Sequence, residues 1–259
     1  MGPEYEVTKL EGYTSREREM NLKLNELFEE WHSCLKAGRF APAWFIADGF
    51  YPQYTRQKKK ILFIGWEGLW LHGGNYIDQL YHWYKNLHID KTPVGRHKFH
   101  RLLLKIAYGL NHGCLPWAEI PPASALAETF ASPGGLSFAF MNFSKLSNET
   151  KSRRPHWPAI AAFLECSQSS GGHFFNREID ILDPDLIIAM NLNDEWLNSL
   201  GEIKTLASSR EKLGHCLLKV NGRETLLLNS FHFSAPYKSD EFDYYEPMAE
   251  AVKNYQAGA

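Results

Sequence analysis

Four short runs of apolar residues along the chain are not interrupted by polar residues. They lie at residues 61–64, 138–141, 186–190 and 226–228. Strands of a parallel sheet show this pattern when helices cover both of their faces. We therefore predict four buried strands. Residues 216–220 are joined to the last run by Asn221-Gly222, a sequence typical of a β-hairpin turn.

Segments with apolar residues at helical spacing alternate with these runs. The first follows a capping-box sequence, Thr14-Ser15-Arg16-Glu17. Further helices are predicted over residues 99–107, 157–166, 174–182 and 242–252. Strands that alternate with helices predict an α/β protein, here a three-layer α/β/α fold with a central, mostly parallel four-stranded sheet. We predict one domain over residues 1–259, with an N-terminal helical extension at about residues 14–38.

The charge of the chain changes the expected class of partner. Its 259 residues carry 28 Lys and Arg against 30 Asp and Glu, a net charge of −2. A protein that binds nucleic acid over a wide surface usually has a basic excess. Contact with DNA would therefore depend on a local basic face. Residues 56–60 and 151–154 are basic runs, which are interpreted as solvated charge or, alternatively, as phosphate-facing segments.

Cysteine usage and hydropathy predict a cytoplasmic protein without membrane contact. Cys34, Cys114, Cys166 and Cys216 are scattered and form no C-x-x-C motif. Isolated cysteines of this kind are typical of reduced, cytoplasmic proteins. No apolar run approaches the roughly 20 residues that a membrane helix needs. We predict neither a metal nor a cofactor, since His97 and His100, one helical turn apart, have no suitably spaced third ligand.

Polar residues follow three of the predicted strands, where ligands bind in open α/β sheets. They are Gly65, Trp66, Glu67 and Gly68 after the first run, Asn142, Ser144 and Lys145 after the second, and His232 and Ser234 after the last. Glu67 could orient water, Asn142 could pair with a ligand edge, and His232 could stabilise negative charge or act as an acid. Each has a structural alternative. Glu67 could be an ordinary loop acid or anchor a helix start, Asn142 could cap a turn, and His232 could be a structural histidine.

These segments, in this order along the chain, resemble the motifs of the uracil-DNA glycosylase superfamily. The resemblance rests on Gly65-Trp66-Glu67-Gly68-Leu69 after an apolar strand, on Phe140-Met141-Asn142, and on His232-Phe233-Ser234-Ala235-Pro236. It covers short pieces of roughly residues 55–256. The chain is similar to a bacterial branch that shares this core.

The resemblance implies excision of a base from a nucleotide that is flipped out of DNA. Asn142 would then hydrogen-bond the base edge, Glu67 would orient water against the sugar carbon, and His232 would bind the departing base. Either Trp70 or Tyr76 would stack on the base. The other residues expected to contact the base or ligand are Gly65, Trp66, Lys145 and Ser234.

The sequence departs from the superfamily beside the candidate acid. Glu67 replaces the usual Asp and reaches about one bond further, a shift that catalysis tolerates poorly. Gly68-Leu69 replaces a Pro-Tyr pair, and Phe233 replaces a Pro. Tyr237 stands near the position of an intercalating apolar residue. Two other hypotheses stay open: a non-catalytic nucleotide or nucleic-acid binding module on the same fold, and a small-molecule nucleoside-type hydrolase.

Overall fold

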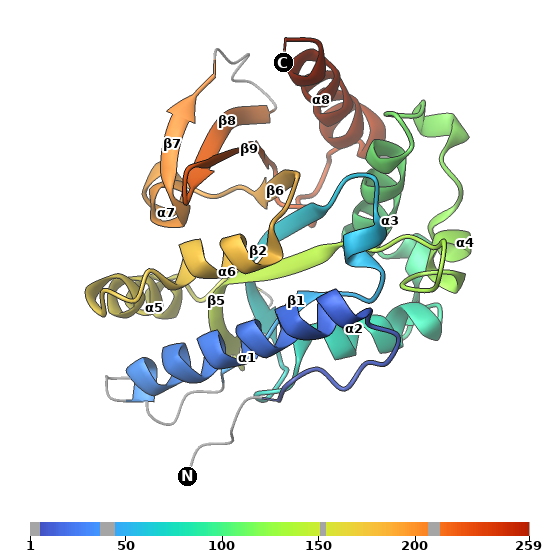
Figure 1. Ribbon diagram of the computed structural model, residues 1–259. Helices are drawn as coiled ribbons and strands as arrows, with labels where there is room; N and C mark the ends of the chain where they lie inside the picture. The colour runs from blue at the N-terminus through green and yellow to red at the C-terminus, as the bar shows by residue number, and fades with distance from the viewer. Residues whose placement is uncertain (1–5, 37–44, 151–153, 207–212, 259) are drawn as a thin grey trace.

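A seven-stranded mixed sheet lies at the centre of the protein (Figure 1). The computed structural model describes residues 6–36, 45–150, 154–206 and 213–258. The strand order is β1-β5-β2-β6-β9-β8-β7. The strands are β1 Gly49–Phe50, β2 Ile61–Leu69, β5 Ala139–Asn148, β6 Leu186–Met190, β7 Glu202–Thr205, β8 Leu213–Val220 and β9 Arg223–Ser230.

The four apolar runs form the four neighbouring strands β5, β2, β6 and β9, which are mutually parallel. The prediction of a parallel core is therefore confirmed. The sheet nevertheless has seven strands rather than four, because β1, β8 and β7 extend it, each paired antiparallel with its inner neighbour in the sheet. The predicted hairpin is also present: Val220 pairs with Arg223, and both turn residues, Asn221 and Gly222, have positive φ as this turn requires.

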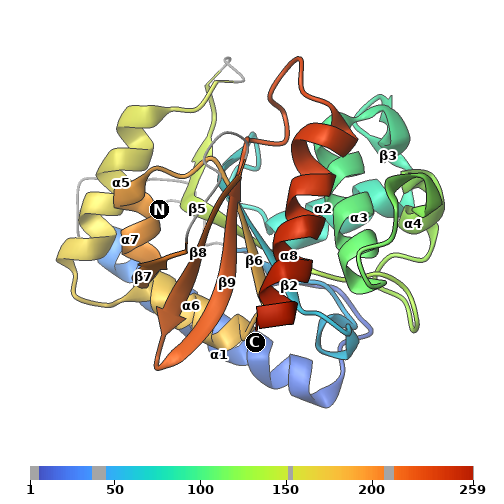
Figure 2. The ribbon, with the colours of Figure 1, turned by 90° about the horizontal axis from the view of Figure 1, so that it is seen from above.

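Helices cover both faces of the sheet, and Figure 2 shows the two groups on either side of the strands. One face carries α2 Tyr76–Lys85, α3 Lys98–Asn111, α4 Ala123–Glu128 and α8 Glu246–Gly258. The other carries α1 Ser15–Lys36, α5 Trp157–Ser169, α6 Phe174–Leu182 and α7 Asp194–Leu200. In β2, Phe63 packs in the first cluster, whereas Leu62 and Ile64 pack in the second. This double burial explains the uninterrupted apolar run.

Short elements complete the chain between these layers. They are the small sheet of β3 His88–Ile89 with β4 Thr92–Pro93, the 3₁₀ turns η1 Tyr54–Arg56, η2 Val94–Arg96 and η3 Trp117–Glu119, and the π-helical turn η4 Asp240–Tyr245. No helix among the described residues is both long and apolar enough to span a bilayer.

The capping box predicted for the first helix is present. The Thr14 backbone N donates to Glu17 Oε2 over 2.8 Å, and the Glu17 N donates to Thr14 Oγ1 over 3.3 Å. Glu17 is buried and also accepts hydrogen bonds from the backbone N and hydroxyl of Thr55. The start of α1 is therefore fixed to the segment that precedes β2. The predicted helix end at residue 38 and residues 151–153 of the second basic run lie outside the described residues.

Candidate functional site

The candidate segment Gly65-Trp66-Glu67-Gly68 belongs to a strand, because β2 continues to Leu69. The prediction that these residues follow the strand is therefore wrong. Gly65 pairs with Asn142, and Glu67 with Ser144, in the parallel register of β2 with β5. β2 thus continues through Gly65 and Gly68 because its backbone pairs with β5.

Gly65 and Asn142 lie side by side on the face of the sheet that α2 and α3 cover. A Cβ at position 65 would lie 2.9 Å from Phe140 Cζ and 3.7 Å from Asn142 Oδ1, so this close approach needs glycine. Asn142 is only 1% exposed, and its backbone N donates to Asp48 Oδ2 over 2.5 Å. Its side-chain Nδ2 has no hydrogen-bond partner among the described residues. A buried amide without such a partner has an unused N–H, and a ligand could accept a hydrogen bond from it.

Aromatic rings pack on Phe140, which lies next to this pair of residues. Tyr76 starts α2, and its ring centroid lies 4.8 Å from that of Phe140. Phe99 of α3 lies 6.2 Å from Phe140 and 5.7 Å from His232. Burial is the main cause that raises the pKa of Tyr76, and the nearby Asp48 carboxylate adds to the shift. Tyr76, one of the two rings predicted to stack on a base, is therefore a neutral phenol on the Asn142 side.

His232 follows β9 and reaches across the carboxyl end of the sheet to β2. Its ring centroid lies 4.4 Å from that of Trp66. Ser234 contacts Nδ1 twice, through Oγ at 2.7 Å and through its backbone N at 3.3 Å. Because a backbone N–H can only donate, Nδ1 is the acceptor, and the neutral ring carries its proton on Nε2. Nε2 has no hydrogen-bond partner in the part of the chain that the structure describes.

Burial lowers the pKa of His232 to about 4, so we expect its imidazole to stay neutral down to moderately acidic pH. The pKa is depressed in the folded state. As pH falls below about 6.5, the unfolded chain therefore gains a proton that the folded chain does not bind, and stability falls. NMR titration of the imidazole, assigned with His232→Asn, measures the midpoint. A midpoint near the ordinary value of 6.5 would contradict this prediction.

Glu67 is half-buried and holds the start of α5. Its Oε1 accepts hydrogen bonds from Asn148 Nδ2 at 2.7 Å and from the backbone N of His156 at 3.0 Å. His156 is the N-cap residue of α5, so the contact fits the alternative in which Glu67 anchors a helix start. Burial raises the pKa of Glu67, while the two hydrogen bonds and the nearby His156 imidazole oppose the shift.

Trp66 connects the candidate site to a row of rings on the α5 side of the sheet. Its ring centroid lies 4.8 Å from that of Trp157, which lies 5.5 Å from Trp196. Trp66 Nε1 is buried without a partner among the described residues, and Trp157 is 47% exposed. The carboxyl edge of the sheet is therefore rich in rings, but Trp66 and His232 occupy part of the space between β2 and β9.

Two predicted binding residues lie apart from the Asn142 side. Lys145 is fully buried on the opposite face, where its Nζ contacts Asp48 Oδ1 at 2.7 Å and Glu178 Oε1 at 2.8 Å. Its ammonium lies 5.5 Å from the Trp31 ring centroid, on the α1 side. Trp70 follows β2, and its indole N–H donates to the Thr150 carbonyl over 2.6 Å. The structure thus groups Gly65, Trp66, Asn142, Tyr76, His232 and Ser234, with Glu67 at their border.

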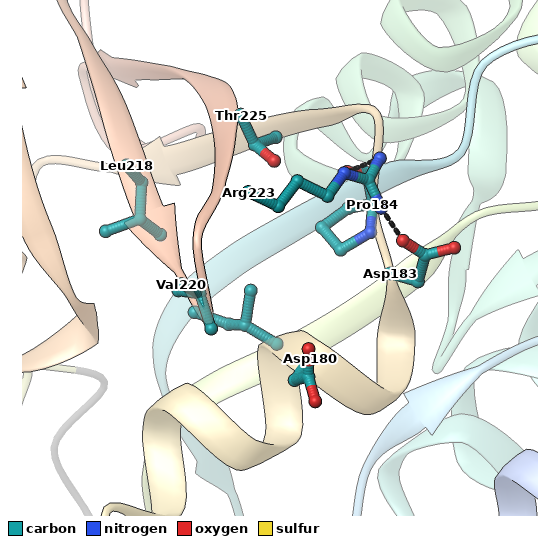
Figure 3. A pocket seen from close by; sticks show the side chains of 8 residues that line it. Asp180, Asp183, Pro184, Leu218, Val220, Arg223 and Thr225 are labelled. Carbon is teal, nitrogen blue, oxygen red and sulfur yellow. Dashed lines mark hydrogen bonds and ion pairs between the residues drawn. The ribbon is translucent and has the colours of Figure 1, made fainter.

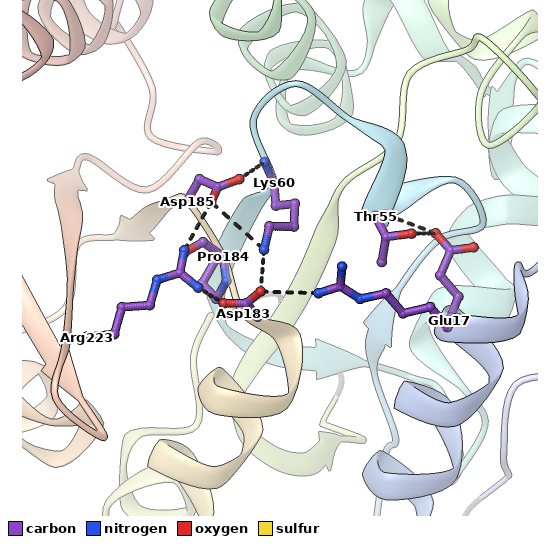
Figure 4. Close-up of polar contacts among 8 residues, drawn as sticks. Glu17, Thr55, Lys60, Asp183, Pro184, Asp185 and Arg223 are labelled. Atoms are coloured by element: carbon purple, nitrogen blue, oxygen red, sulfur yellow. Dashed lines mark hydrogen bonds and ion pairs between the residues drawn. The ribbon is translucent and has the colours of Figure 1, made fainter.

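A second polar cluster lies at the opposite, amino end of the parallel strands (Figure 4). Lys60 Nζ contacts Asp183 Oδ2 at 2.5 Å, and the Lys60 backbone N donates to Asp185 Oδ2 over 2.8 Å. Arg223 forms ion pairs with both aspartates. A small pocket beside the cluster has Leu218 in its wall (Figure 3). Because its charges are paired with one another, we interpret the cluster as a structural link between β2, β6 and β9.

No group of three or more His, Cys, Asp and Glu side chains suited to a metal ion occurs among the described residues. His100 Nδ1 lies 3.0 Å from the Tyr84 hydroxyl, so this ring nitrogen is already engaged. No protein-family model and no curated protein matches the chain. The function is therefore inferred from the site itself.

Proposed function

We propose that this chain is a glycosylase-like hydrolase that cleaves the N-glycosidic bond of a base flipped out of DNA. The observation that carries the proposal is the buried Asn142 amide beside Gly65, whose Nδ2 has no partner among the described residues and near which aromatic rings pack on Phe140. A carboxamide offers a donor and an acceptor to a base edge, and the rings offer stacking surfaces. We also propose the three-layer uracil-DNA glycosylase-like fold, supported by four central parallel strands between helical layers.

The proposed reaction assigns a separate role to each polar group. Asn142 pairs with the base, and the Nε2–H of His232 donates to the base as negative charge develops on it. Glu67 orients a water whose oxygen bonds to the sugar carbon while the carbon–nitrogen bond breaks. The water proton passes to the carboxylate, and the base leaves with the bonding electron pair.

DNA is the proposed partner, and a cytoplasmic location goes with it. Tyr237 lies five residues after His232 and is fully exposed at a positive φ of 58°, where a ring could enter a duplex. All four cysteines are free thiols, which agrees with a reducing compartment. We propose no cofactor, because the groups assigned above account for each step of the hydrolysis.

The test is release of base from uracil- and hypoxanthine-containing oligonucleotides, single- and double-stranded. We expect wild type to leave abasic sites and Glu67→Gln to leave far fewer, since the amide cannot accept the water proton. Glu202→Gln, on the exposed edge strand β7, is the matched control and should match wild type. If wild type releases no base from any damaged oligonucleotide, the repair-enzyme proposal is wrong.

A non-catalytic nucleotide or nucleic-acid binding module is the second candidate. One observation favours it: the described hydrogen bonds of Glu67 both hold Oε1 in place beside the start of α5. A binding module predicts that oligonucleotides or nucleotides bind without turnover, and that Glu67→Gln binds them equally well. Hydrolysis of free nucleosides in the same assay would instead indicate a small-molecule hydrolase.

A further inference from the structure

Asn148, the last residue of β5, joins Glu67 to the segment before α5. Its side chain is buried, and Nδ2 donates both to Glu67 Oε1 at 2.7 Å and to the Arg154 carbonyl at 3.1 Å. Its Oδ1 accepts from the Thr150 backbone N at 3.0 Å and from the Thr150 hydroxyl at 2.7 Å. Two donors and two acceptors are thus all in use, which fixes the amide plane.

The orientation of this amide follows from its partners. A backbone N–H can only donate, so the Asn148 atom that faces Thr150 is the carbonyl oxygen. The NH₂ group must then face Glu67 and the Arg154 carbonyl. A turn in which an Asn oxygen accepts the N–H two residues later is a common local motif, so the contacts within residues 148–150 orient the donor toward Glu67.

We propose that Asn148 is a positioning residue, which holds Oε1 of Glu67 and leaves Oε2 as the oxygen that faces the reacting water. This role rests on the hydrolase function proposed above. Both described hydrogen bonds of the carboxylate end on Oε1, one from the Asn148 side chain and one from the His156 backbone. The His156 donor is a main-chain group at a helix start, so Asn148 is the partner that a side-chain substitution can remove.

Among the described residues, the His156 imidazole acts on the Glu67 carboxylate and opposes the rise in its pKa. Glu149 Oε2 lies 2.9 Å from His72 Nδ1 on the adjoining loops, and Arg154 lies in the same segment. Loss of the Asn148 donor removes a contact that favours the ionised form, so the Glu67 titration should move to higher pH.

The first test uses the wild-type protein. In an NMR titration with ¹³C-labelled glutamate, assigned with Glu67→Gln, the Asn148 side-chain amide signals should change with the same midpoint as the Glu67 carboxyl carbon. Amide signals that stay constant through the Glu67 midpoint would overturn the proposal. This readout does not depend on catalytic activity, so it is decided separately from the hydrolase function.

The second test uses two variants and one control. Asn148→Ser and Asn148→Asp should both raise the Glu67 midpoint, with the larger change for Asp because it adds a like charge. In the active protein, both should lower kcat by about 10–100-fold with KM little changed, the size typical of a misplaced catalytic group. Asn193→Ser, at the N-cap of α7, is the control and should leave the Glu67 midpoint unchanged. An unchanged midpoint in folded Asn148→Ser contradicts the positioning role.

Discussion

Lys145→Met is expected to lower the free energy of unfolding by about 3–5 kcal/mol, as the loss of one partner from a buried charge network does. Lys145, Asp48 and Glu178 have fully buried side chains, and the ammonium contacts both acids. Methionine fills a similar volume but leaves the Asp48 carboxylate without its cation. Urea unfolding followed by tryptophan fluorescence measures the change.

Glu178→Gln is the matched control within the same network. Burial is the main cause that raises the pKa of Glu178 well above its ordinary value of 4.5, with the Lys145 cation opposing and the Asp48 carboxylate assisting the shift. The raised pKa favours the protonated form of Glu178, which glutamine resembles. We expect this variant to lower the free energy of unfolding much less than Lys145→Met does. If Lys145→Met cost less than about 1 kcal/mol, the network would not be a main support of the fold.

The same control predicts a pH dependence. As pH rises above the ordinary carboxyl range, the unfolded chain releases the Glu178 proton that the folded chain keeps, so wild type loses stability. Glu178→Gln has no proton to release at this position. Its stability relative to wild type should therefore increase from acidic to neutral pH. Parallel changes in both proteins over this range would show that Glu178 ionises normally in the fold.

The central strands could be predicted from the sequence because burial on both faces leaves uninterrupted apolar runs. The edge strands could not. β7 is mostly exposed and carries Glu202 and Lys204, which form ion pairs with neighbouring strands rather than an apolar pattern. β1 has only two residues. The extension of β2 through Gly65 and Gly68 could not be predicted from the sequence either, since glycines usually weaken a strand unless pairing and close approach require them.

The candidate site was predictable where it depends on the ends of parallel strands, and not where it depends on distant contacts. His232 follows β9 as that rule predicts, whereas Asn142 lies inside β5 rather than after it. Lys145 was misplaced because it was expected after the end of the second strand; within a strand, three residues from Asn142, it must face the opposite side. Asp48 meets Asn142 across 94 residues of sequence, which no local pattern indicates. Asn148 had a weak signal, the Asn-Glu-Thr sequence of an Asn-led turn.

His232→Ala is expected to lower kcat for base release by about 10²–10³-fold, the usual loss when one donor to a developing anion is removed. In the proposed reaction, the Nε2–H bond to the base strengthens as the base becomes negative, so KM should change little. Single-turnover excision measures the chemical step. The chain offers a graded comparison, since Ser234→Ala keeps the Nε2–H but removes the hydroxyl at Nδ1.

Ser234→Ala should therefore lose less than His232→Ala, because the Ser234 backbone N–H still contacts Nδ1 and selects the same tautomer. The order of these two losses in kcat shows whether His232 acts as a hydrogen-bond donor or only as a packing residue. The His232 ring also packs against Trp66 and Phe99, so His232→Phe keeps ring packing while removing the donor. If His232→Phe releases base as fast as wild type, the imidazole is structural. If it is as slow as His232→Ala, the lost hydrogen bond rather than the lost packing accounts for the rate.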